Sequence, residues 1–353
     1  MLTPFFDPEK SYEQNWEEGP FGAFADGEVL EFPDKGNFEL FGKKLNFPIG
    51  IPAGPLLNGK FVKSALDKGF DVPMYKTVRT RVHKSHPWPN VLAVQIKGDL
   101  TLEGAKGKLL AKSVYKEPLS ITNSFGNPSY DPEFWQKDLK DAVSYAKEGQ
   151  WVAASWEGTD WEGRGEKAFI EDWRLGARLL RETGINLMEM NFSCPNKGTE
   201  NLLCHDVETS RKIAEAVKSE AGVIPLAVKM SYMSKDYLQK FVKALAGIVD
   251  AFSVINTIAA EIVDERGEQA LPGPGRLRSG VCGAAIKWAG LDMTRRLKSL
   301  RDELGLKYAI ISTGGVMSPK DFKEYRKAGA DLVMSATGAM WNPYLALEIR
   351  NKK

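Results

Sequence analysis

Short apolar segments recur along most of the chain, and the intervals between them are long enough for a helix. Each segment holds five to eight residues and is rich in Val, Ile, Leu, Met and Ala. The eight segments span residues 47–54, 74–78, 151–155, 187–191, 225–230, 251–256, 308–312 and 332–336. Continuous apolar runs are typical of parallel strands covered by helices. Eight such units predict an α/β fold, a (β/α)8 TIM barrel, because parallel strands need right-handed crossovers.

An open doubly wound sheet is the alternative, but no Gly-x-Gly-x-x-Gly follows the first segment. Helical spacing, capping residues and terminal glycines place the helices between the segments. The expected helices span residues 60–68, 131–148, 167–183, 207–221, 236–247, 284–304 and 343–350.

Three stretches do not follow this rhythm. Residues 1–45 lack a long amphipathic pattern and predict an N-terminal arm with a short hairpin, formed by Glu28–Phe32 and Phe38–Gly42. Residues 46–353 are then the barrel domain. Within it, residues 80–118 form an excursion, and residues 259–283 form a long loop rich in Gly, Pro and Arg. A loop of that length in a compact domain is usually functional.

Composition narrows the class of protein. The net charge is +2, from 48 basic and 46 acidic residues, which gives no reason to expect nucleic acid or an anionic membrane surface. The N-terminus does not read as a secretory signal, and no apolar run is long enough to span a membrane. Cys194, Cys204 and Cys282 are too few and too widely spaced for a disulfide scaffold or a structural zinc site. We expect a cytoplasmic protein without a metal.

Polar residues and glycines gather where the expected strands end. Lys76 and Lys229 end two strands, although lysine is rarely buried without a partner. Four asparagines offer the paired donors and acceptors that suit a planar amide ring: Asn123, Asn191, Asn196 and Asn256. Glycines follow strands seven and eight, the common phosphate site of this fold. The pattern predicts a phosphorylated cofactor beside a planar polar ligand, although a solvated rim would also account for the lysines.

The segment Met188–Asn196 contains several candidate binding or catalytic residues close together. It reads as a strand that ends at Pro195, with Asn191, Ser193 and Cys194 at its end. An ordinary Pro-Asn turn with a half-buried cysteine is the alternative interpretation. No histidine stands at an expected strand end, so Cys194 is the group there that can act as a base near neutral pH.

These residues resemble a known family. Asn191-Phe-Ser-Cys-Pro-Asn196 resembles the Asn-Leu-Ser-Cys-Pro-Asn signature of class 1 dihydroorotate dehydrogenases, and the likeness extends over most of residues 45–350. The other similar motifs follow in the same order and are Tyr75-Lys-Thr77, Asn123-Ser-Phe-Gly126, Ala227-Val-Lys229, Ile255-Asn-Thr257, Ser312-Thr-Gly-Gly315 and Ser335-Ala-Thr-Gly338.

The resemblance implies FMN as cofactor and Cys194 as the base that removes the C5 proton of dihydroorotate while the C6 hydride passes to flavin N5. The implied substrate-binding residues are Lys76, Asn123, Phe125, Gly126, Asn127, Asn191, Asn196, Asn256 and Thr257. The implied cofactor-binding residues are Ala53, Gly54, Lys76, Thr77, Asn191, Lys229, Ile255, Gly283, Gly314, Gly315, Ala336 and Thr337.

The sequence departs from the family pattern at several positions. Asn127 stands where an apolar residue is more common, Ser155–Gly158 is an unusual strand ending, and Arg276 and Arg278 add charge near the expected phosphate end. Alternatives are therefore an FMN enzyme acting on another dihydropyrimidine, or a non-catalytic ligand-binding barrel. The family also implies a homodimer. The electron acceptor stays open between fumarate, a quinone, and NAD reached through an electron-transfer partner subunit.

Overall fold

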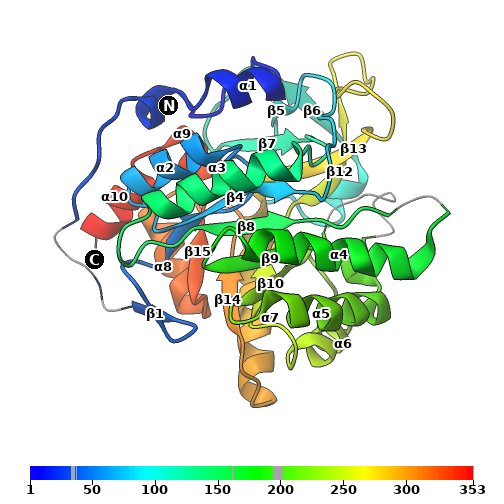
Figure 1. Ribbon diagram of the computed structural model, residues 1–353. Helices are drawn as coiled ribbons and strands as arrows, with labels where there is room; N and C mark the ends of the chain where they lie inside the picture. The colour runs from blue at the N-terminus through cyan, green and yellow to red at the C-terminus, as the bar shows by residue number, and fades with distance from the viewer. Residues whose placement is uncertain (33–35, 37, 161–162, 194–201, 353) are drawn as a thin grey trace.

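The computed structural model describes residues 1–32, 36, 38–160, 163–193 and 202–352. Its centre is a closed barrel of eight parallel strands, each paired with its neighbours in sequence order (Figure 1). The strands are β3 (Ile49–Ile51), β4 (Val72–Val78), β8 (Ala153–Trp156), β9 (Leu187–Asn191), β10 (Leu226–Lys229), β11 (Ala251–Val254), β14 (Ala309–Ser312) and β15 (Leu332–Met334). The predicted (β/α)8 barrel is confirmed, and every barrel strand overlaps one of the eight apolar segments.

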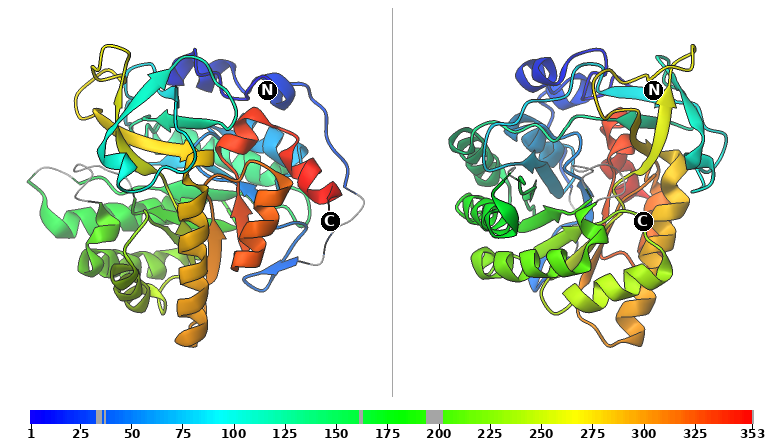
Figure 2. Two further views of the ribbon diagram at one scale, coloured as in Figure 1. Left: turned by 180° about the vertical axis from the view of Figure 1, so that it is seen from behind. Right: turned by 90° about the vertical axis from the view of Figure 1, so that its right-hand side faces the viewer.

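Helices cover the outside of the barrel (Figure 2). They are α2 (Gly59–Asp67), α3 (Pro132–Tyr145), α4 (Gly165–Arg181), α5 (Val207–Ala221), α6 (Lys235–Leu245), α7 (Lys287–Glu303), α8 (Pro319–Ala328), α9 (Thr337–Trp341) and α10 (Leu345–Asn351). Helix α3 begins as the sequence predicts, with the Asp131 side chain accepting from the backbone N–H of Glu133. Helices α8 and α9 were not predicted, although α8 has a Ser318 cap and ends at Gly329 in the left-handed region. Across the described ranges, no helix is long and apolar enough to cross a bilayer.

Side chains of each barrel strand alternate between the interior and the covering helices. On β9, Met188 and Met190 pack in the cluster between the barrel and its helices, whereas Leu187 packs with the interior cluster. Glu189 and Asn191 lie two and four residues after Leu187, so they also face the interior. The same alternation directs Lys229 inward, because it is the Cα partner of Asn191.

A second sheet of five strands, itself closed into a small barrel, stands beside one end of the main barrel. It consists of β5 (Val91–Val94), β6 (Lys108–Lys112), β7 (Ser120–Asn123), β12 (Ile258–Val263) and β13 (Arg278–Gly283). The prediction that residues 259–283 form a loop is therefore wrong for much of its length. Strand β12 pairs with β6, and β13 pairs with β7, so this segment joins the 80–118 excursion in one sheet (Figure 1). The pairing was missed because it joins residues far apart in the sequence.

The N-terminal arm also differs from the prediction. Residues 28–32 form no strand, and the hairpin pairs β1 (Phe38–Leu40) with β2 (Lys43–Leu45). Phe41 and Gly42 form its turn with φ of 53° and 71°, as a two-residue primed turn requires. A helix, α1 (Tyr12–Glu18), starts at a capping box between Ser11 and Gln14, whereas the predicted arm contained no helix. Four short 3-10 turns complete the fold: Gly22–Ala25, Gly104–Lys106, Leu203–His205 and Ala284–Ile286.

Candidate active site

The carboxyl ends of all eight parallel strands meet at one end of the barrel, which we call the mouth. Residues predicted as site residues lie at or just after these strand ends. They are Ala53 and Gly54 after β3, Lys76 and Thr77 on β4, Asn191 on β9, Lys229 on β10, Ile255, Asn256 and Thr257 after β11, Gly314 and Gly315 after β14, and Ala336 and Thr337 after β15. The second sheet brings Asn123 and Gly283 to the same region.

Both predicted lysines are buried at the mouth. Lys76 is 4% exposed and Lys229 is 9% exposed. The Nζ atom of Lys76 lies 5.1 Å from the ring centroid of Phe125, within range of a cation–π contact. The residue next to it, Thr77, donates from its hydroxyl to Ser155 on β8 at 3.3 Å. Lys76 therefore joins β4 to the loop after β7.

Asn191 and Asn256 are linked through Ser193. The Ser193 hydroxyl donates to Oδ1 of Asn191 at 3.1 Å, and Nδ2 of Asn256 donates to the same hydroxyl at 2.9 Å. This chain of bonds crosses from β9 to β11 over β10. Cys194 and Asn196, which come after Ser193 in the sequence and are predicted site residues, lie outside the described residues.

The Cys282 thiol connects two predicted site residues, Asn123 and Thr337, although no site role was predicted for Cys282 itself. Nδ2 of Asn123 donates to Sγ of Cys282 at 3.4 Å, and the Thr337 hydroxyl donates to the same sulfur at 3.5 Å. Burial raises the pKa of this thiol, so it is neutral at physiological pH. Cys282 thus lies between the predicted substrate loop and the loop after β15.

Residues 123–129, which run from the end of β7, contain four residues predicted to bind substrate: Asn123, Phe125, Gly126 and Asn127. We call this segment the substrate loop. Its Phe125 ring packs edge-on against Phe6 and Tyr12, so the N-terminal arm covers it. Gly126 has a φ of 80°, and a Cβ there would approach the His86 ring to 2.7 Å. Glycine is therefore required by both conformation and space.

Two departures from the family pattern meet at the far end of this loop. Nδ2 of Asn127 donates to Oε2 of Glu157 at 2.6 Å, and Glu157 follows β8. Arg79 joins them, donating from Nη2 to Glu157 at 3.2 Å and from Nε to the Asn127 carbonyl at 3.1 Å. Arg79 and Glu157 are 3% and 2% exposed, so this is a buried ion pair that anchors the loop.

Arg276 anchors the other end of the loop, which corrects its predicted place near the phosphate end. Its side chain is 2% exposed and donates to Ser124 Oγ, Ser124 O, Pro87 O, Pro89 O and Pro272 O at 2.5–3.1 Å. All five of its N–H donors are satisfied by uncharged acceptors. Burial lowers the pKa of Arg276 to about 10, so the guanidinium stays charged at neutral pH.

His86 adds a pH dependence to this loop. Its Nδ1 lies 3.1 Å from Ser124 Oγ, and its pKa is lowered by burial and by the nearby Arg276 charge. The unfolded chain therefore binds more protons than the folded chain below about pH 6.5. The stability that His86 contributes is complete above that pH and is lost as the pH falls through the lowered pKa. We expect the melting temperature to fall on acidification from about pH 7 to 5, and less steeply in His86→Gln. Parallel slopes would contradict this role.

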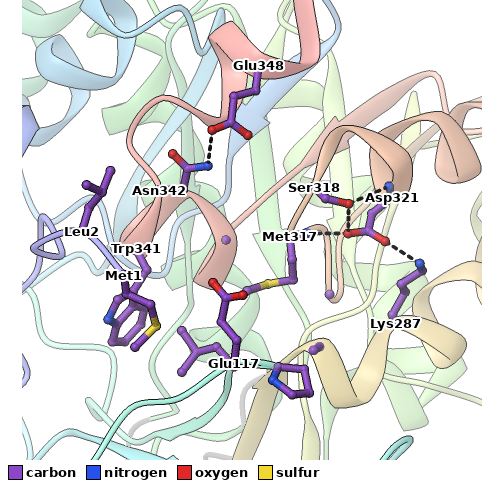
Figure 3. A pocket seen from close by; sticks show the side chains of 15 residues that line it. Met1, Leu2, Glu117, Lys287, Met317, Ser318, Asp321, Trp341, Asn342 and Glu348 are labelled. Atoms are coloured by element: carbon purple, nitrogen blue, oxygen red, sulfur yellow. Dashed lines mark hydrogen bonds and ion pairs between the residues drawn. The ribbon is translucent and has the colours of Figure 1, made fainter. Parts of the chain in front are cut away.

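A cavity of about 590 Å³ lies beside the loops that follow β14 and β15 (Figure 3). Gly315 and Gly338 line it together with Met1, Leu2 and Trp341, so the start of the arm reaches this side of the mouth. Gly315 has a φ of 67°, and a Cβ there would meet Lys287 at 2.6 Å. Lys287 is held beside the cavity by ion pairs with Asp321 and Glu324. The glycines leave space beside the loops after β14 and β15, the usual phosphate position of this fold, and the carboxylates of Glu117, Asp321 and Glu348 also line the cavity.

Comparison with known proteins gives a consistent family. Residues 37–352 match the family model described as dihydroorotate dehydrogenase. Dihydroorotate dehydrogenase from Dictyostelium discoideum is 36% identical, with 99% of this chain and 97% of that protein covered. The catalytic subunit of dihydroorotate dehydrogenase B (NAD(+)) from Desulforamulus reducens is 30% identical, covering 73% of this chain and 78% of that subunit. The crystal structure of the Eimeria tenella enzyme in complex with ferulenol matches with a TM-score of 0.71 at 16% identity, covering 94% and 87% of the two chains, a likeness that shows the fold alone.

The closed parallel barrel defines the architecture as a (β/α)8 barrel, and the family match makes the chain an oxidoreductase. Within that class, the chain belongs to the dihydroorotate dehydrogenase family, whose members are flavoproteins that use FMN. The family predicted from the motifs is confirmed.

Proposed function

We propose that this chain oxidises dihydroorotate to orotate in pyrimidine biosynthesis, with FMN as hydride acceptor and a cysteine base of the class 1 type. The supporting observation is the convergence of Asn123, Asn191 and Asn256, from three separate elements, on a mouth that also holds Lys76 and Lys229. Amide side chains suit the alternating donors and acceptors of a pyrimidine ring. The two lysines suit an anionic substrate and a cofactor that gains negative charge.

The residues divide between two roles. FMN supplies a hydride acceptor at N5 when it is bound. We propose that Lys229 lies at its N1/O2 edge, that Lys76 contacts both cofactor and substrate carboxylate, and that the phosphate and ribityl chain lie among Gly283, Gly314, Gly315, Ala336 and Thr337. Ala53, Gly54, Thr77, Asn191 and Ile255 complete the cofactor side.

On the substrate side, Asn123, Asn191, Asn196 and Asn256 hold the pyrimidine, and Phe125, Gly126, Asn127 and Thr257 shape the rest of the pocket. Cys194 removes the C5 proton, since a carbon acid beside a carbonyl needs a positioned base. The anchors at Arg79, Glu157 and Arg276 keep the substrate loop in place, because catalytic groups must be held close to the productive geometry.

The decisive experiment measures cofactor and reduction in one preparation. We expect denatured protein to release one FMN per chain, and anaerobic dihydroorotate to bleach the flavin absorbance of the native protein. Dihydrouracil is the control, because it lacks the carboxylate that Lys76 is proposed to contact. Release of FAD, or equal bleaching by both compounds, would contradict the proposal.

We further propose that the chain acts in the cytoplasm as a homodimer, with residues 1–45 as the arm and residues 46–353 as the FMN-binding barrel. The similarity to NAD-dependent catalytic subunits supports a partner subunit for electron transfer. Analytical ultracentrifugation tests the dimer, and turnover with fumarate, with a quinone, or with NAD and added partner identifies the acceptor.

A further inference from the structure

Glu189 is a buried carboxylate that the proposed reaction does not use. It lies in the middle of β9, faces the barrel interior and is 0% exposed. Neither of its oxygen atoms has a hydrogen-bond partner among the residues that the structure describes. A buried ionised carboxylate without compensation is costly, so a charge or ligand near it is expected.

Lys229, the lysine proposed to contact the cofactor, lies within ion-pair distance of Glu189. Nζ of Lys229 lies 3.9 Å from Oε1 of Glu189, at the limit of an ion pair. The strand register explains the arrangement. Lys229 is level with Asn191, whereas Glu189 is level with Ala227 and Ser155, one interior layer further from the mouth. The lysine therefore lies between the carboxylate and the mouth.

This order of charges has an electrostatic consequence. A carboxylate behind Lys229 offsets part of the positive potential that the lysine projects into the mouth, and low effective dielectric makes the interaction strong there. It also fixes the ammonium group in position, because leaving the barrel wall would separate the two charges. The residues level with them on the neighbouring strands, Ala227 and Ser155 beside Glu189 and Ser253 beside Lys229, are uncharged. Lys76 on β4 is a further buried charge at the mouth.

We propose that Glu189 is a positioning residue that holds Lys229 and sets the reduction potential of the bound FMN through it. This inference rests on the proposed function, because it places the flavin N1/O2 edge at Lys229. Positive charge at that edge stabilises the reduced, anionic flavin, so a carboxylate that offsets the charge lowers the potential. The barrel would thereby tune how readily reduced FMN gives up its electrons.

The test is the reduction potential of bound FMN, measured against reference dyes at fixed pH. Glu189→Gln keeps the shape of the side chain and removes its charge, so the potential should rise. Lys229→Met should lower it. In the Lys229→Met background, Glu189→Gln should change the potential less than it does in the wild-type chain, because Glu189 is proposed to act through Lys229. Glu189→Asp retracts the carboxylate and should give a smaller rise than glutamine.

The outcomes separate this inference from the proposed function. An unchanged or lowered potential in Glu189→Gln would overturn the inference, as would an equal rise in the presence and absence of Lys229. If Glu189→Gln fails to fold, an unaltered potential in Glu189→Asp overturns it instead. A wild-type chain that binds no FMN, or a Lys229→Met variant with wild-type potential, would refute the proposed function or its placement of the cofactor.

Discussion

Replacing Cys194 with alanine is expected to slow the reduction of bound FMN by dihydroorotate about 10²–10⁴-fold, the usual contribution of a positioned general base. The proton at C5 of the substrate is weakly acidic, and no other side chain near Ser193 in the motif can accept it at neutral pH. FMN content should be unchanged, since the thiol is not proposed to hold the cofactor. Anaerobic stopped-flow bleaching of the flavin measures the rate.

The other two cysteines are matched controls. Cys204 is fully buried, its thiol lies 3.4 Å from Ser231 Oγ, and burial raises its pKa, so Cys204→Ala should bleach at the wild-type rate. Cys282→Ala should keep the chemical step and weaken orotate binding, because it removes the acceptor for Asn123 and Thr337. Cys194→Ser should recover activity only at high pH, because a hydroxyl is a far weaker acid. A Cys194→Ala variant that bleaches as fast as wild type would refute the assignment.

The barrel was predictable from sequence because its strands are buried on both faces and therefore read as unbroken apolar runs. Strand β9 begins at Leu187 and ends at Asn191, as expected, and β10 ends at Lys229. The polar residues at the mouth were predictable for a related reason. Lysine is rarely buried without a partner, so a lysine at the end of an apolar strand indicates a binding site or a solvated rim, and the strand direction places such residues at one end of the barrel.

The second sheet and the anchors of the substrate loop were not predictable, because each depends on residues distant in sequence. Arg276 reads as an ordinary charged residue in a Gly/Pro-rich loop until β13 pairs with β7 and brings it beneath Ser124. Glu157, which follows β8, likewise forms an ion pair with Arg79, which follows β4 and is distant in sequence. The role of Glu189 was not predictable, because one polar residue in an apolar strand does not reveal its neighbour on the next strand.

Replacing Arg276 is the second change expected to have a large effect, in this case on the stability of the fold. Arg276→Met keeps much of the side-chain volume but leaves the carbonyls of Pro87, Pro89, Pro272 and Ser124 without this donor. Each buried acceptor left unsatisfied costs about 1–3 kcal/mol, and such costs are not additive. We expect the free energy of unfolding to fall by about 2–4 kcal/mol. Urea unfolding monitored by tryptophan fluorescence measures it.

The same variant should affect substrate more than cofactor, because Arg276 holds the loop that contains Asn123 and Phe125 and makes no contact with the glycines beside the cavity. Orotate binding should weaken about tenfold or more, which corresponds to about 1.4 kcal/mol, while FMN stays bound. Arg278→Met is the matched control two residues away, because Arg278 is partly exposed and its Nη2 donates to the carbonyls of Ala105 and Ala259. It should cost about 1 kcal/mol or less and leave orotate affinity intact. Equal losses in the two variants would mean that Arg276 stabilises the second sheet in general, without a specific role in holding the substrate loop.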